Sequence, residues 1–140
     1  MPQKQYTVID LFAGAVFDYA REHENIGLIF RPHPDVKKEL IRLGYWSEDD
    51  YKALLEYCDL TDNIVFDRHS TYEEAYAVSD AIIADACCGI SISALPTGKP
   101  ICLTYRSRWE ESYYPDIADA YYEARSENEV VQFMDMIEEG

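Results

Sequence analysis

Short, continuously apolar runs alternate along the chain with segments whose apolar residues recur at helical spacing. The runs that predict strands are residues 25–30, 63–66, 81–84 and 99–104, with 121–122 as a short fifth. Continuous apolar character is typical of strands covered on both faces, as in a parallel sheet. Right-handed crossovers then place helices on both sides, so the sequence predicts an α/β fold with a Rossmann-like parallel sheet.

Helices are predicted between these runs from the spacing of their apolar residues. They cover residues 7–23, 36–43, 47–58, 70–79, 89–96 and 126–137. Two Ser-x-x-Glu patterns, at 70–73 and 126–129, are capping boxes that mark helix N-termini. The last helix is expected to turn inward the side chains of Val130, Phe133, Met134 and Ile137.

Length and charge limit the classes of partner. The chain has 140 residues, which fits one domain over 1–140, and its apolar content of 48% argues against disorder. Asp and Glu number 27 against 12 Lys and Arg, which gives a net charge of −15. Nucleic acids and anionic membranes need a cationic face, so neither is expected as a partner, and no direct membrane contact is predicted.

The cysteines and the first residues favour a cytoplasmic protein. Cys58, Cys87, Cys88 and Cys102 show no C-x-x-C spacing, and an adjacent pair is a poor structural disulfide. They are expected to be reduced and mostly buried, and the pattern does not favour a zinc site with His23, His33 or His69. No cofactor is predicted, and no apolar export segment follows Met1.

Polar and ionisable side chains follow each predicted strand, where open parallel sheets bind their ligands. The sets are residues 31–34, 67–70, 85–89 and 105–108. In the first, Arg-Pro-His-Pro, each proline holds the residue before it in extended geometry. Arg31 and His33 thus stand on a stiff cationic segment suited to a phosphate. A strand-ending turn with a structural salt bridge at Arg31 explains the same residues.

The stretch from Asp85 to Gly89 is the second candidate wall of a ligand cleft. A tight turn into a helix leaves backbone N–H groups for an anion, and Gly89 permits close approach. Cys87, at a helix N-terminus, is also a candidate nucleophile, although no base is paired with it. A plain strand-to-helix turn is the structural alternative.

Two stretches together resemble a known family. "FRPHP" (Phe30–Pro34) and "SDAIIADACCGISISALPTGKPICLTY" (Ser79–Tyr105) are similar to the C-terminal half of the CDP-glycerol glycerophosphotransferases, which build teichoic-acid polymers. In that family, R-P-H-P follows a strand, and S-D, T-D-Y-S-S and G-K-P-I come later in the same order. The resemblance covers residues 7 to 105, and D-Y-S-S reads Asp85-Ala86-Cys87-Cys88 here.

The resemblance implies the nucleotide-binding C-terminal half of a two-domain GT-B transferase. His33 takes the role of the catalytic histidine near the transferred phosphoryl group, with Arg31 beside it. Asp85, Cys87, Cys88 and Gly89 are the implied substrate-binding residues. The implied ligands are CDP-glycerol or a similar nucleotide donor and a polyol-phosphate acceptor, and the implied partner is an N-terminal domain missing from this chain. The resemblance also implies that the whole enzyme is attached to the inner face of the membrane through regions outside this chain. The chain is expected to be a fragment that is inactive alone.

Two alternatives stay open. One is the donor domain of a GT-B glycosyltransferase that uses a nucleotide sugar. An acidic residue early in the helix after Cys88 would favour this alternative, but that position is occupied by Ile92. The other is a non-catalytic binding or regulatory module, such as a receiver-like domain. A receiver needs acidic residues after its first strand, whereas the residues at that place here, Arg31 and His33, are basic.

Overall fold

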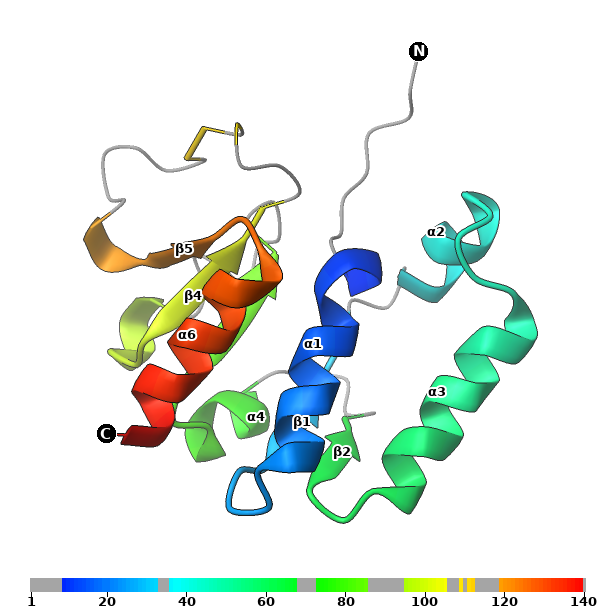
Figure 1. Ribbon diagram of the computed structural model, residues 1–140, viewed down its shortest axis with the longest axis horizontal. Helices are drawn as coiled ribbons and strands as arrows, with labels where there is room; N and C mark the ends of the chain where they lie inside the picture. The colour runs from blue at the N-terminus through cyan, green and yellow to red at the C-terminus, as the bar shows by residue number, and fades with distance from the viewer. Residues whose placement is uncertain are drawn as a thin grey trace. The chain divides into compact units, whose positions relative to one another are not determined.

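The computed structural model describes residues 9–32, 36–67, 73–85, 95–105, 109, 111–112 and 119–139 (Figure 1). Its helices are α1 (Ile9–Glu22), α2 (Val36–Arg42), α3 (Glu48–Leu60), α4 (Glu73–Val78), the 3₁₀ turn η1 (Leu95–Thr97) and α6 (Glu127–Glu139). Its strands are β1 (Leu28–Phe30), β2 (Ile64–Phe66), β3 (Ile82–Asp85), β4 (Ile101–Thr104) and β5 (Tyr122–Ala124).

Every strand pairing in the described part of the chain is parallel, which confirms the predicted α/β class. The strands form two small sheets, β1–β2 and β3–β4–β5, and the arrangement is compatible with a Rossmann-like fold. The chain divides into two compact units: residues 17–72, called the α3 unit below, and residues 1–16 with 73–140, called the α6 unit.

In the α3 unit, β1 and β2 pair in a register that places Phe30 beside Phe66. The Phe30 ring meets the Phe66 ring at 5.6 Å and the Phe17 ring of α1 at 5.1 Å, both edge to face. Leu40, Cys58 and Ile64 are buried. Aromatic and aliphatic burial therefore holds these short strands and helices together.

The side chain of Asn63 joins the α1–β1 connection to the start of β2. Its Nδ2 donates to the carbonyl oxygens of Ala20 (2.6 Å) and Ile26 (2.9 Å) and lies 3.3 Å from that of His23. The last carbonyls of a helix have no N–H partner within the helix, so side-chain donors of this kind satisfy them. One residue thus fixes both the end of α1 and the entry into β1.

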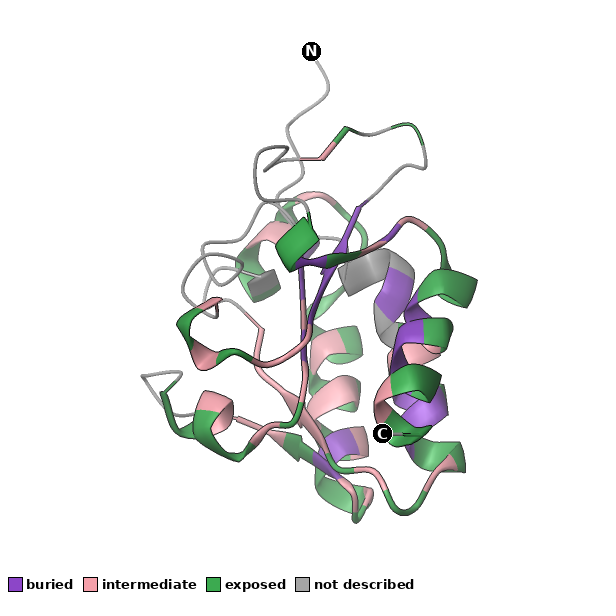
Figure 2. Ribbon diagram, turned by 90° about the vertical axis from the view of Figure 1, so that its left-hand side faces the viewer, coloured by how far each residue is buried: buried purple, intermediate pink, exposed green. Residues whose placement is uncertain are grey.

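In the α6 unit, β4 is the central strand and all four of its residues are buried. One face of this sheet carries a cluster made by Ile82, Ala84, Ile101, Leu103, Tyr105 and Tyr121. In α6, Val130, Phe133 and Met134 are buried, as predicted, while Ile137 is half-buried. Figure 2 shows buried residues alternating with exposed ones along some of the helices, the pattern of amphipathic elements, whereas α4 has no buried residue.

Helix starts agree closely with the sequence signals. Ser47 is the N-cap of α3, and its hydroxyl accepts from the Asp50 N–H while the Asp50 side chain accepts from the Ser47 N–H. At α6, Ser126 Oγ accepts from the Glu129 N–H at 3.3 Å, but the returning bond goes from Arg125 N–H to Glu129 Oε1. The box predicted at 70–73 and the helix predicted at 89–96 fall largely outside the described residues.

Candidate functional site

Arg31 lies immediately after β1, and Asp67 immediately after β2. Arg31 Nη1 is 3.1 Å from Asp67 Oδ2, and the Asp67 N–H donates to the Phe30 carbonyl at 2.9 Å. The side chains are 20% and 7% exposed, so this ion pair is largely withdrawn from solvent. The salt bridge considered from the sequence is thus confirmed, at the strand ends where α/β sheets bind ligands.

The other sequence-predicted site residues are placed only in part. His33, Cys87, Cys88 and Gly89 lie outside the described residues. Asp85 is the last residue of β3, and its backbone lies in register with Thr104 of β4. The structure therefore joins Arg31 to Asp67, which stood among the polar residues after the second predicted strand but was given no role there. The remaining assignments stay predictions.

The Gly-Lys-Pro part of the second quoted stretch has a structural role here. Gly98 has φ +71°, a conformation that favours glycine, and its N–H donates to the Leu95 carbonyl at 3.2 Å. Lys99 Nζ donates to the carbonyl of Tyr76 and, at 3.2 Å, to that of Ala77, at the end of α4. A cation at a helix C-terminus satisfies exposed carbonyls and the helix dipole, so Lys99 ties α4 to β4.

A second polar cluster sits at the carboxyl ends of β4 and β5 in the α6 unit. The hydroxyl of Tyr105 donates to Glu123 Oε2 at 2.5 Å, and Ser112 Oγ lies 2.8 and 2.7 Å from the two oxygens of that carboxylate. The guanidinium carbon of Arg125 is 4.2 Å from the centre of the Tyr105 ring, and its Nη1 is 3.8 Å from Glu123 Oε1.

This cluster was missed by the sequence analysis, except that Tyr105 stood among the residues after a predicted strand. Glu123 and Arg125 flank the last residue of β5, and that position is the signal that could have found them. Because the carboxylate accepts from two hydroxyls, the network chiefly anchors Ser112 to the sheet.

Removing the Tyr105 hydroxyl measures the strength of this anchor. We expect Tyr105→Phe to lower the free energy of unfolding by about 1.5 kcal/mol, because a charge-assisted hydrogen bond is lost while the ring packing stays. Urea unfolding followed by circular dichroism gives the value. Tyr45→Phe, at an exposed tyrosine of the other unit, is the control and should change stability by less than about 0.5 kcal/mol. Equal effects of the two variants would refute the anchoring role.

Cys58 and Cys102, the two cysteines in the described part of the chain, are buried and reduced, as predicted for them. Cys102 is one of the residues that line a groove of about 220 Å³, together with Tyr122, Glu123, Glu129, Gln132, Phe133 and Met136. Burial, and secondarily the charge of Glu129, raises the pKa of the Cys102 thiol to about 12. A thiol in this state is a poor nucleophile at neutral pH.

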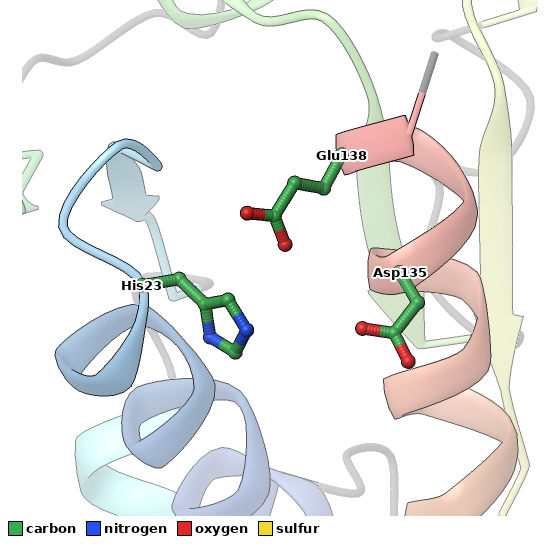
Figure 3. A group of neighbouring side chains, drawn as sticks. All are labelled: His23, Asp135 and Glu138. Carbon is green, nitrogen blue, oxygen red and sulfur yellow. The ribbon is translucent and has the colours of Figure 1, made fainter.

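His23, which the sequence analysis weighed as a metal ligand, packs against the end of its own helix. Its Nδ1 donates to the Tyr19 carbonyl at 2.8 Å, and its ring stacks on the Tyr19 ring at 3.9 Å. Figure 3 shows the imidazole just beyond the last turn of α1. These contacts fix the ring as part of the α1 terminus.

Helix α6 presents an acidic surface. Its sequence contains five acidic residues and no Lys or Arg: Glu127, Glu129, Asp135, Glu138 and Glu139. Asp135 and Glu138 leave the helix on the same side, one turn apart (Figure 3). An anionic ligand would be repelled by this helix.

No helix in the described part of the chain is both long and apolar enough to cross a membrane. Comparison of the sequence and the fold with protein-family models, with curated proteins and with solved structures gives no match. The resemblance to the glycerophosphotransferases therefore rests on the quoted sequence motifs.

Proposed function

We propose that the chain is the donor-binding domain of a CDP-glycerol:polymer glycerophosphotransferase. The observation that carries the proposal is the position of Arg-Pro-His-Pro directly after β1, with Arg31 held at the carboxyl end of that strand by Asp67. Ligands of parallel α/β sheets bind at such ends, and a guanidinium is well matched to a diphosphate. The quoted motifs supply the choice of CDP-glycerol.

The proposed reaction is a phosphoryl transfer that depends on positioning and charge. A hydroxyl of the polyol-phosphate acceptor forms a new O–P bond to the glycerol phosphate group. The bond from that phosphorus to the bridging oxygen breaks, and CMP leaves with the electron pair. Arg31 and His33 stabilise the negative charge on the diphosphate. The proton of the acceptor hydroxyl goes to a base, which we assign to the partner domain of the transferase.

The second wall of the proposed site is the segment after β3. Backbone N–H groups at the start of the helix predicted after Cys88 bind a phosphate oxygen, which is the usual anion site of such turns. We assign Asp85 and Gly89 to this predicted turn, and Cys87 and Cys88 take the place of two serines of the family motif. A thiol is a weaker donor than a hydroxyl, so the backbone carries most of this contact.

The test is a calorimetric titration of the chain with CDP-glycerol, CDP, UDP and UDP-glucose. We expect weak binding with a preference for the cytidine ligands, and a loss of about tenfold or more in Arg31→Ala and in His33→Ala, since a hydrogen bond to a charged group contributes about 1.5 kcal/mol or more. The control is Arg42→Ala, which removes an exposed arginine that pairs with Glu39 on α2.

The alternatives give different results in the same titration. A preference for UDP-glucose would favour a nucleotide-sugar glycosyltransferase. Absence of binding to all four ligands, or equal affinities of the wild type and Arg31→Ala, would contradict a donor site at the end of β1. The second result would favour a module in which the Arg31–Asp67 pair only closes the strand ends.

A further inference from the structure

Asp67 is a nearly buried carboxylate beside the proposed ligand residue. With 7% of its side chain exposed, it has lost most of its hydration, and Arg31 at 3.1 Å compensates for that loss. A buried ion pair is often no more stabilising than an apolar pair of the same size, because desolvation offsets the attraction. Stability alone is therefore a weak reason for a charged pair at this strand end.

We propose that Asp67 is a positioning residue that fixes the plane of the Arg31 guanidinium for the diphosphate of the donor. This inference rests on the proposed function. It assigns to Asp67 no contact with the donor: the carboxylate acts through Arg31.

The geometry explains how one carboxylate sets this orientation. A guanidinium is a planar fork of five N–H donors, so a bond at Nη1 restricts the directions in which the whole fork can donate. Asp67 is itself held, because its backbone N–H donates to the Phe30 carbonyl in continuation of the β1–β2 pairing. The orientation of the Arg31 guanidinium is thus fixed relative to the sheet at two points: by its own backbone at the end of β1, and by Asp67 at the end of β2.

The sign of the charge makes the proposal testable. A negative carboxylate close to a diphosphate weakens binding by repulsion if it acts only through its charge. Replacing Asp67 by Asn would then tighten donor binding. If Asp67 acts by orienting Arg31, the same replacement weakens donor binding. The guanidinium is then disordered before binding, and the entropy lost when the donor orders it reduces the free energy of binding.

The experiment uses the full chain as wild type, Asp67→Asn, Arg31→Ala and Arg31→Lys, with Arg42→Ala as the control. The first measurement is the rate of rotation of the Arg31 guanidinium in the ligand-free chain, from ¹⁵N nuclear magnetic resonance of its Nη groups. We expect slow rotation in the wild type and rotation about tenfold faster in Asp67→Asn. The second is the affinity for CDP-glycerol, expected to fall about fivefold in Asp67→Asn and about tenfold in Arg31→Ala and Arg31→Lys.

The outcomes separate this inference from the proposed function. Unchanged or tighter donor binding in Asp67→Asn, with weaker binding in Arg31→Ala, overturns the positioning role and leaves the donor site standing. Donor binding that is absent, or indifferent to Arg31→Ala, overturns the donor site and this inference with it. Equal rotation rates in wild type and Asp67→Asn overturn the positioning role without reference to any ligand.

A second variant covers the case in which Asp67→Asn does not fold. Asp67→Glu keeps the charge and moves the carboxylate by one methylene group. Positioning predicts a loss of about threefold to tenfold in affinity at equal charge, because the fork is displaced. Wild-type affinity in folded Asp67→Glu would contradict it.

Discussion

Asn63→Ala is expected to lower the free energy of unfolding by about 2 to 3 kcal/mol. The side-chain amide donates to the carbonyls of Ala20 and Ile26 at 2.6 and 2.9 Å, and it lies 3.3 Å from a third, that of His23. Alanine removes this donor, although the carbonyls of Ala20 and His23 keep a backbone N–H donor at 3.3 and 3.0 Å. The expected loss therefore corresponds to one acceptor left without its donor, at about 1 to 3 kcal/mol, and to weaker satisfaction of the other two. The end of α1 and the start of β1 should loosen together.

Urea unfolding followed by circular dichroism measures this loss, and amide hydrogen exchange locates it. Asp62→Ala, at the exposed neighbouring position, is the matched control and should change stability by less than about 0.5 kcal/mol. The faster exchange is expected at residues 20–28, with the amides of β4 unaffected. An Asn63→Ala variant as stable as the control would show that water replaces the amide at no cost.

Much of the secondary structure could be predicted because its signals are local. Ser47 caps α3 and Ser126 caps α6 through hydrogen bonds to residues three positions away, so the sequence alone carries the information. The apolar run at 99–104 became β4, whose four residues are all buried, because side chains covered on both faces leave a continuous apolar pattern. The run at 63–66 became β2, but Val65 is exposed, so this strand is not covered on both faces as predicted. The division of the strands between two sheets has no such local signal.

The long-range polar links could not be predicted because they join residues far apart in the chain. Asn63 reaches carbonyls up to 43 positions earlier, and any of many polar side chains could have had that role. Arg31 was identified at the end of a strand, but its partner Asp67, 36 positions later, depends on the register of β1 with β2. Register is fixed by packing across the sheet, which a single sequence does not reveal.

Lys99 illustrates why a motif alone does not define a site. Within the quoted stretch, Gly-Lys-Pro reads equally as part of a ligand loop or as a turn. In the structure, the ammonium group of Lys99 bonds to carbonyls at the end of α4, and Gly98 takes up the left-handed turn. The Gly-Lys-Pro part of the resemblance is therefore explained by a role in folding. Among the described residues, substitution of Arg31 is then the most informative test of the proposed function.

The thiol of Cys102 should make the folded chain progressively less stable at alkaline pH. The side chain is 1% exposed in the central strand β4, and burial raises its pKa to about 12. In the unfolded chain the pKa returns to about 8.5. Between these values the unfolded state loses the proton while the folded state keeps it. Stability is thus complete below about pH 8.5 and falls by about 1.4 kcal/mol for each further pH unit, up to the folded pKa.

Cys102→Ala isolates this effect, because the variant has no thiol to ionise. The difference in unfolding free energy between wild type and variant, measured in urea at pH 7, 8, 9 and 10, should be constant up to pH 8. By pH 10 it should shrink by about 2 kcal/mol. Tyr45→Phe, which removes one exposed tyrosine, should keep the wild-type dependence. A difference that stays constant to pH 10 would mean that the thiolate is solvated in the folded chain, and that the groove beside Cys102 admits water to the strand.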